Sequence, residues 1–181
     1  KEDFVSQEKD LNNYIEGKRV LGAYGLQSAK ESNRIFLDVR LFYTYGAGQK
    51  ANSLINQLFQ CSLGNEIMQL SPCEIFRDYI HIDDLAKGHV ASLEILNKSS
   101  NNDGFNIFNL GTGNGTSVLE LIYAFEKTNG IKINYKFSEK RIGDIPISFA
   151  DVSKVKKVLK WQAKKDIYDM CKDIWNYQTL N

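Results

Sequence analysis

FRDYIHIDDL, residues 76–85, is the stretch that decides the fold. It places Arg77 and Tyr79 two positions apart in an apolar segment, so both side chains are expected on one face of a strand. Asp83 stands where a helix would begin, and its carboxylate is expected to cap the first free amides. An arginine fork beside a tyrosine ring suits a phosphate and a flat ring. The alternative is an ordinary strand with a surface Arg–Asp pair.

The neighbouring segments alternate between strand and helix patterns. The helix expected over residues 84–96 has an apolar stripe of Leu85, His89, Leu93 and Leu96. Residues 36–42 predict a strand with Leu37, Val39 and Leu41 on one face, and a glycine-punctuated turn follows. Residues 52–55 open another helix, and residues 66–71 predict a short strand. This alternation is typical of an α/β protein.

A glycine-rich loop at residues 111–116 allows two interpretations. It lies between a strand pattern at 105–110 and a helix that Ser117 and Glu120 would open as a capping box. With an alternating segment at 131–137 and Glu139 near the place of a ribose-binding acid, it imitates a dinucleotide-binding unit. The third glycine position is Thr116, so the fingerprint is incomplete. The other interpretation is a tight turn that contacts no cofactor.

Two further apolar stripes predict helices near the end of the chain. The first follows Asp151, which is expected to cap it, and contains Val152, Val155, Val158 and Leu159. The second is formed by Ile167, Met170, Cys171, Ile174 and Trp175. Both helices are interpreted as structural.

Composition bounds the class of protein. The 181 residues are 43% hydrophobic and 25% charged, with a net charge of +1, which is typical of a soluble globular chain of about one domain. No basic field indicates a nucleic-acid partner, and no apolar run or targeting segment indicates a membrane. The 3 cysteines are widely spaced. We therefore expect reduced thiols in a cytoplasmic protein, with a Cys61–Cys73 disulfide as the alternative, and no metal site.

Residues 77–81, RDYIH, and residues 84–89, DLAKGH, resemble the nucleotide-sugar epimerases and dehydratases of the extended short-chain dehydrogenase/reductase family. The resemblance continues through residues 140–146 to the last helix. It implies the C-terminal part of an NAD(P)-binding Rossmann-like fold with a small α/β substrate-binding domain, the N-terminal glycine-rich βαβ unit being absent from this chain. Residues 1–50 would be a remnant of the NAD-binding domain. Residues 51–181 would mainly bind the nucleotide sugar, with residues 74–97 returning to the Rossmann sheet.

The resemblance also implies site residues. The tyrosine of the family acts as the catalytic acid–base, and one strand end lies beside the nicotinamide of NAD. The implied residues are Tyr24 for catalysis, Phe42 for the cofactor, and Tyr43, Ser53, Leu54, Arg77, Tyr79, Arg141 and Asp144 for the nucleotide sugar. Tyr43 replaces an asparagine of the family, which leaves the exact sugar nucleotide open.

The region around Tyr24 departs from the family. The family has a lysine four residues after its tyrosine, but Ser28 stands there and Lys30 lies two residues farther on. A lone exposed tyrosine in a turn is therefore the alternative. Residues 28–35 are interpreted as a short polar link where the family has a long helix. A break in the chain near Gln27–Ala29 would then mark missing residues, whereas an unbroken peptide would count against it.

Three functions remain open at this stage. The first is an NAD-dependent epimerase that interconverts UDP-glucose and UDP-galactose through a 4-keto intermediate, with a homodimer as its assembly. The second is a 4,6-dehydratase or a deoxysugar-nucleotide reductase of the same superfamily, which Tyr43 favours slightly. The third is a nucleotide-sugar-binding remnant without catalysis, favoured by the absent glycine loop and the displaced lysine.

Overall fold

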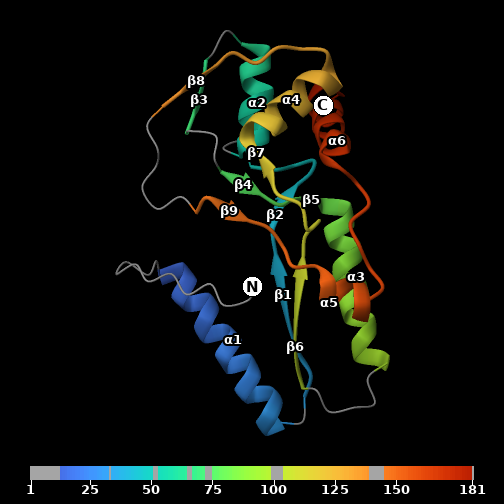
Figure 1. Ribbon diagram of the computed structural model, residues 1–181. Coiled ribbons are helices and arrows are strands. Elements are labelled where there is room, and N and C mark those ends of the chain that lie inside the picture. Colours follow the sequence, from blue (N-terminus) through green and yellow to red (C-terminus); the bar gives the residue numbers. More distant parts are fainter. Residues whose placement is uncertain are drawn as a thin grey trace.

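The computed structural model describes residues 13–32, 34–50, 53–64, 67–71, 75–98, 104–138 and 145–180. Within these ranges the chain is an α/β protein, which confirms the predicted fold class. Figure 1 shows helices gathered at one end of the molecule and a long pair of strands at the other, with short strands between them. Two hydrophobic clusters correspond to these two ends. The first cluster lies at the end with the long strands, and the second cluster lies at the end with the gathered helices.

The long pair consists of β1 (Phe36–Leu41) and β6 (Phe105–Leu110), which run parallel and in register over all six residues. Side chains alternate between the faces of a strand, so Leu37 and Val39 pack into the first cluster while Phe36 faces the opposite side. The first cluster is built from β5 (Tyr79–His81), α3 (Ile82–Lys98), β6 and α5 (Ser153–Val158) with Trp161. Leu41, which was expected to share the buried face, is exposed because β1 ends there.

Helix α1 (Asn13–Ser32) covers the other face of β1. The predictions of a turn around Tyr24 and of a polar link over residues 28–35 are therefore wrong, and so is the break near Gln27–Ala29, because the helix is continuous there. The physical reason is close packing at Gly25. A Cβ at this position would lie 2.3 Å from the Phe36 ring, so the glycine that resembles a turn residue is a contact point between helix and strand.

Helix α3 begins two residues earlier than predicted. His81, and not Asp83, caps it, because the imidazole Nδ1 accepts a 3.1 Å hydrogen bond from the Asp83 amide. The expected stripe is also wrong at Leu93, which is 58% exposed. The buried side of the helix instead contains Gly88, where a Cβ would lie 2.9 Å from Leu110. The small residue lets α3 approach β6 more closely than the predicted leucines would.

The second cluster joins the helices α2, α4 and α6 with the strand pair β3–β8. The bounds are α2 (Leu54–Leu63), β3 (Met68–Leu70), α4 (Val118–Asn129), β8 (Tyr135–Phe137) and α6 (Ile167–Leu180). The predicted apolar side of α6 is confirmed, and α2 and α4 also bury one side in this cluster. The capping box is confirmed as well, since Ser117 Oγ accepts from the Glu120 amide and the Glu120 carboxylate accepts a 2.7 Å bond from the Ser117 amide. The strand expected over 131–137 is only three residues long.

Helix α5 (Ser153–Val158) is shorter than the apolar stripe that predicted it, which ran from Val152 to Leu159. Val155 is buried in α5, whereas Val158 is exposed near the helix end. The N-cap of α5 is Val152 and not the predicted Asp151. The Asp151 carboxylate still accepts a 3.0 Å hydrogen bond from the Ser153 amide.

The short middle strands lie between the two clusters. Strand β2 (Tyr43–Tyr45) pairs in parallel with β5 (Tyr79–His81). Strand β4 (Phe76–Arg77) lies between β7 (Thr116–Ser117) and β9 (Ile147–Ser148). Residues 76–81 are thus two strands in two sheets, and the prediction that Arg77 and Tyr79 share one strand is wrong.

Three expectations concern features outside the packed elements. Cys171 is a free thiol. The Cys61–Cys73 alternative stays untested, because Cys73 lies outside the described residues. The described ranges hold no cluster of His, Cys, Asp and Glu side chains suited to a metal ion. None of the helices in those ranges is both long and apolar enough to cross a membrane.

Candidate functional site

A buried carboxylate separates β4 from β5. Asp78 is completely buried, and its Oδ1 accepts hydrogen bonds from the Thr112 amide at 2.8 Å and the Thr112 hydroxyl at 2.6 Å. Its Oδ2 accepts from the Gly113 amide at 2.9 Å and the Ala150 amide at 3.1 Å. These four bonds turn the chain from one sheet into the other, and the sequence analysis gave Asp78 no role.

The same contacts explain the glycine-rich loop at residues 111–116. Its amides face the Asp78 carboxylate, so they are engaged by an anion of the chain itself. A Cβ at Gly111 would lie 2.5 Å from Asp78 Oδ2, and Gly113 has a φ of 83°, which only glycine adopts readily. The loop therefore has the form of an internal carboxylate cradle and offers these amides to no pyrophosphate.

Arg77 and Tyr43 meet at the carboxyl end of β1. The Arg77 guanidinium lies 5.6 Å from the centroid of the Tyr43 ring, a cation–π contact. Its Nη1 donates to the carbonyls of Phe76 at 2.9 Å and Ile145 at 2.6 Å. Within the residues that the structure describes, no other acceptor meets this guanidinium, and its remaining N–H groups suit a phosphate. Arg77 is only 8% exposed while Tyr43 is 52% exposed.

The ring of Tyr79 packs against Tyr43, the aromatic partner of Arg77. Its ring lies 6.1 Å from that of Tyr43 and 5.0 Å from that of Tyr45, both measured between centroids. Burial raises the pKa of Tyr79 to about 12, although the nearby Arg77 acts in the opposite direction. Burial likewise raises the pKa of Tyr45. Both phenols are therefore neutral at physiological pH, and the Tyr79 ring packs against Tyr43.

The start of α2 presents two buried polar atoms. Ser53 Oγ and Gln49 Oε1 are buried without a hydrogen-bond partner among the described residues. Such orphaned atoms are uncommon in native structures and suit contact with a ligand. The Asn56 side chain holds the preceding loop in place by donating to the carbonyls of Gln49 at 2.8 Å and Lys50 at 3.0 Å. Leu54, by contrast, packs against the second cluster.

Arg141 and Asp144, which the resemblance assigned to the diphosphate and the ribose, lie outside the described residues. The nearest described residue is Ile145, whose carbonyl accepts the bond from Arg77. The sequence segment that holds both residues therefore leads directly into the Arg77 contact.

The position of Tyr24 follows from the direction of α1. Gly25 lies against Phe36 and Gly22 lies near Asp38, so the helix runs antiparallel to β1, as Figure 1 also shows. Tyr24 is therefore level with the beginning of β1 and 66% exposed. At about 3.3 Å per strand residue, Phe42 lies roughly 13–20 Å farther along the strand. Tyr24 and Phe42 are not brought together.

The start of α1 reaches the level of Phe42 instead. Residue 14 precedes Gly22 by eight positions, which is about 12 Å at 1.5 Å per helical residue, and this matches the distance from Asp38 to Phe42. Tyr14 and Lys18 occupy this first part of the helix at a spacing of four, so their backbone positions share one face. The sequence analysis missed this pair, although the Tyr-x-x-x-Lys spacing was visible in the sequence.

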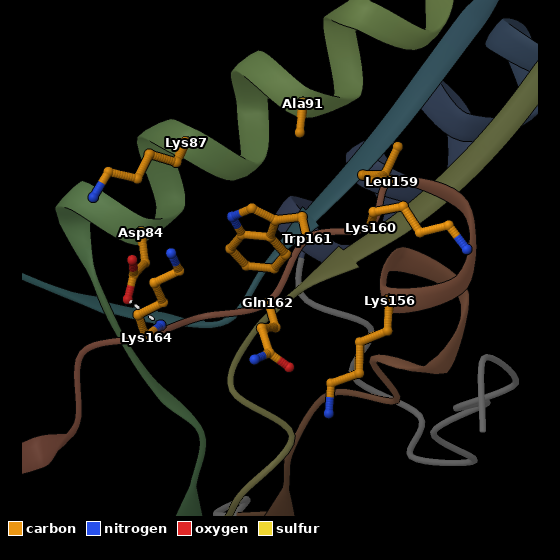
Figure 2. Close-up of a pocket in the computed structure, with 9 residues that line it drawn as sticks. All are labelled: Asp84, Lys87, Ala91, Lys156, Leu159, Lys160, Trp161, Gln162 and Lys164. Atoms are coloured by element: carbon orange, nitrogen blue, oxygen red, sulfur yellow. Dashed lines mark hydrogen bonds between the residues drawn. The ribbon is translucent and has the colours of Figure 1, made fainter.

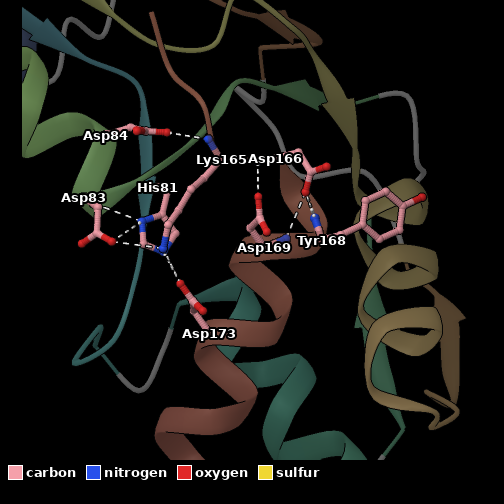
Figure 3. A network of polar contacts seen from close by, with 8 residues as sticks. All are labelled: His81, Asp83, Asp84, Lys165, Asp166, Tyr168, Asp169 and Asp173. Carbon is pink, nitrogen blue, oxygen red and sulfur yellow. Dashed lines mark hydrogen bonds and ion pairs between the residues drawn. The ribbon is translucent and has the colours of Figure 1, made fainter.

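A network of charged side chains joins α3 to α6 (Figure 3). His81 Nδ1 accepts from an amide, so its proton is on Nε2, which lies 3.0 Å from the Asp173 carboxylate. Lys165 Nζ lies 2.6 Å from Asp173 and 3.0 Å from Asp83. The hydrogen bond to Asp173 raises the pKa of Lys165, and the bond from Lys165 lowers the pKa of Asp83. The network fixes β5, which carries Tyr79, relative to the second cluster.

Comparison with known sequences identifies relatives. Residues 1–111 match the group described as the NAD dependent epimerase/dehydratase family. The UDP-glucose 4-epimerase of Bacillus subtilis is 38% identical over 161 residues, which covers 79% of this chain and 47% of the relative. UDP-glucose 4-epimerase 1 of Oryza sativa subsp. japonica is 50% identical over 105 residues, which covers 58% of this chain and 30% of the relative.

Comparison with solved structures supports the fold. The UDP-glucose-4-epimerase of Stenotrophomonas maltophila, solved with bound NAD and formylated UDP-arabinopyranose, matches with a TM-score of 0.78 and 32% identity. That match covers 92% of this chain and 53% of the other. This chain thus spans about half the length, or less, of the relatives it matches.

Proposed function

The chain belongs to the NAD-dependent epimerase/dehydratase family, and from this premise we propose that it acts in an NAD-dependent nucleotide-sugar epimerase. In this proposal it grips the nucleotide of the substrate and supplies the reacting tyrosine. The finer proposal is that the substrates are UDP-glucose and UDP-galactose, interconverted through a 4-keto sugar. The relatives named UDP-glucose 4-epimerase support this reaction.

The observation that carries the proposal is the contact between Arg77 and Tyr43. A nearly buried guanidinium, held by two carbonyls and covered by an exposed ring, is oriented before any ligand arrives. Such preorganisation reduces the conformational cost of binding a diphosphate. The orphaned Ser53 hydroxyl and Gln49 amide oxygen supply polar contacts for the base. Arg141 and Asp144 complete the grip on diphosphate and ribose in this proposal.

The described residues fit the nicotinamide end of NAD and not its pyrophosphate end. Phe42 and the first turns of α1 lie at one level at the carboxyl end of a parallel strand, where α/β sheets bind ligands. The glycine-rich loop at 111–113 is filled by Asp78, so it holds no cofactor phosphate. NAD, when bound, supplies the redox chemistry by exchanging a hydride with the sugar carbon.

The proton is handled by a tyrosine of α1. Tyr24 is the candidate from the resemblance, but its level along β1 and its missing lysine partner favour Tyr14. A lysine four residues later on the same helical face, Lys18, would favour the ionised phenol by its positive charge. The phenolate then takes the proton of the sugar hydroxyl as a general base, and the phenol returns it as a general acid.

The experiment compares two conservative variants of the full-length protein with UDP-galactose as substrate. Tyr14→Phe should lower kcat by at least about a hundredfold, the scale of a lost general acid–base group, and Tyr24→Phe should leave it within about threefold. Nucleotide binding is tested separately. Arg77→Ala should weaken UDP by about 1.5–3 kcal/mol, the range for a hydrogen bond to a charged group. Full activity in Tyr14→Phe together with unchanged UDP affinity in Arg77→Ala would overturn the proposal.

A dehydratase or reductase of the same superfamily is the second candidate, favoured by Tyr43. This residue occupies the place of a family asparagine and contacts Arg77 through its ring. Analysis of the products from UDP-galactose separates the reactions, because epimerisation gives UDP-glucose and dehydration gives a 4-keto-6-deoxy sugar. Binding of UDP without any product would favour the non-catalytic remnant.

The assembly and location belong to the same proposal. Val20, Leu21 and Tyr24 leave apolar surface exposed on α1, which supports a homodimer formed through this helix. The free thiol of Cys171 is compatible with the cytoplasm. The division at residue 50, with residues 74–97 returning to the Rossmann sheet, is supported by the placement of Ile80 and Leu85 in the first cluster. Light scattering of the full-length protein tests the dimer.

A further inference from the structure

A cleft lies between helix α3 and the chain around α5, and none of its lining residues belongs to the site proposed above (Figure 2). Its volume is about 550 Å³, within the range of about 300–1,000 Å³ for small-molecule sites. Four lysines line it: Lys87 from α3, Lys156 from α5, and Lys160 and Lys164 from the segment before α6.

The ionisable side chains that line this lysine cleft are mostly positive. None of the four lysines forms an ion pair with any residue in the ranges that the structure describes. The one carboxylate in the wall, Asp84, is almost completely buried, and its Oδ2 accepts 2.7 Å hydrogen bonds from the amides of Lys164 and Lys165. The backbone therefore satisfies this carboxylate, and the ammonium groups create an excess of positive potential over the cleft.

The floor of the cleft adds a donor of a different kind. Trp161 is 9% exposed, and Figure 2 shows its indole nitrogen turned toward the side lined by Asp84 and Lys87. Its N–H donates to no residue that the structure describes. The indole nitrogen is not among the buried side-chain atoms that lack a partner. It therefore reaches the cleft and is available to an acceptor there.

The backbone at the cleft is also unusual. Lys160 has a φ of 53°, and it is the only non-glycine residue with a positive φ in the described part of the chain. Lys160 directly follows Leu159, the C-cap of α5, and a left-handed residue at this position is a common way for a helix to end. Here it turns the chain between Val158 and Trp161 so that consecutive residues line the same cleft.

We propose that the lysine cleft binds a small molecule carrying phosphate groups, at a site separate from the nucleotide-sugar site. The lining offers ammonium groups, an indole N–H and the amide of Gln162, so it is dominated by donors. A phosphate ester presents several strong acceptor oxygens with one to two negative charges in a compact shape. Lysine meets such a group as a mobile point charge on a flexible stem, so several lysines can adjust to one phosphate.

Inorganic pyrophosphate is the probe, titrated into the full-length protein while UDP at saturation occupies the nucleotide site. The indole N–H signal of Trp161, assigned by its loss in Trp161→Phe, should shift in nitrogen-15 NMR, whereas that of Trp175 in the second cluster should not. Calorimetry measures the affinity. Lys87→Gln/Lys160→Gln should weaken pyrophosphate by at least about tenfold, the scale of one or two charged hydrogen bonds.

The matched control removes the same charge elsewhere. Lys136→Gln/Lys172→Gln changes two exposed lysines of β8 and α6, and it should leave the affinity within about twofold, because distant surface charges are screened. Equal weakening in both double variants would indicate non-specific attraction and overturn the proposal. So would binding of pyrophosphate without a shift of the Trp161 indole signal, or the absence of pyrophosphate binding in the UDP-saturated protein.

Discussion

Replacement of Asp78 tests whether one buried carboxylate holds the site together. Its two oxygens accept four hydrogen bonds, three from backbone amides and one from a hydroxyl. Asp78→Ala removes all four and leaves the amides of Thr112, Gly113 and Ala150 without an acceptor. Each buried unsatisfied group costs about 1–3 kcal/mol. Since water can reach part of the loop, we expect the lower part of the sum, a loss of about 3–5 kcal/mol in unfolding free energy.

Asp78→Asn provides a graded variant. The amide keeps one acceptor oxygen, and the Thr112 hydroxyl can rotate to accept from the new NH₂ group. One or two bonds to a charged acceptor are then lost, so the expected destabilisation is about 1.5–3 kcal/mol. The free energy of unfolding is measured by urea denaturation of the full-length protein at a fixed NAD concentration, with the m-value compared among variants.

Asp38→Ala is the control for the loss of an aspartate. Asp38 forms a partly exposed ion pair with Arg40 at 3.2 Å, and such pairs contribute about 0–1 kcal/mol. The reasoning is refuted if Asp78→Ala is also within about 1 kcal/mol of the parent protein. It is equally refuted if Asp78→Asn is no less damaging than Asp78→Ala, because the order follows from counting the acceptors.

Three other predictions concern packing, pH and the glycine loop. Gly25→Ala should destabilise the protein by about 1–3 kcal/mol in urea denaturation, because the new Cβ overpacks the contact with β1. Gly17→Ala has nothing within 4 Å of its new Cβ, so it should stabilise α1 by up to about 1 kcal/mol in the same assay. Equal effects of the two variants would contradict the close contact between helix and strand. The hydrogen bond from Lys165 holds the pKa of Asp83 below its ordinary 3.8, so the ion pair stabilises the fold above pH 3.8 and this stabilisation is lost as the pH falls through the lower folded-state pKa. The difference in unfolding free energy between the parent and Lys165→Met should therefore shrink at that low pH. A difference that stays constant with pH would argue against the ion pair. Gly113→Val should lower the unfolding free energy because of its φ of 83°, and selective loss of NAD in calorimetry, with normal melting and UDP affinity, would show instead that the loop binds the cofactor.

The sequence by itself determined the elements whose side chains pack within a short span. The apolar side of α6 is confirmed because residues three and four apart share a helical face whatever the tertiary context. The capping box of α4 is confirmed for the same reason, since Ser117 and Glu120 reach each other across one turn. Strand β6 has the predicted bounds, Phe105–Leu110. The family resemblance rested on such local stretches.

Helix α1 shows where local patterns mislead. Gly22 and Gly25 resemble turn residues, and the polar sequence after Tyr24 lacks a clear apolar stripe. Only the approach of the Phe36 ring shows that Gly25 is a packing contact inside a helix. The direction of α1 relative to β1 then favours Tyr14 over Tyr24, although the spacing of Tyr14 and Lys18 could have been noticed in the sequence.

The tertiary structure alone decided what the charged and polar groups contact. Asp78 meets Thr112 across 34 residues and Ala150 across 72, and no periodic pattern encodes a contact between segments so far apart. The same is true of Arg77 and the Ile145 carbonyl, 68 residues away, and of the lysine cleft. Hydrophobic periodicity fixes elements because burial depends on one face of one segment, whereas a site depends on the directions in which several folded segments bring their side chains together.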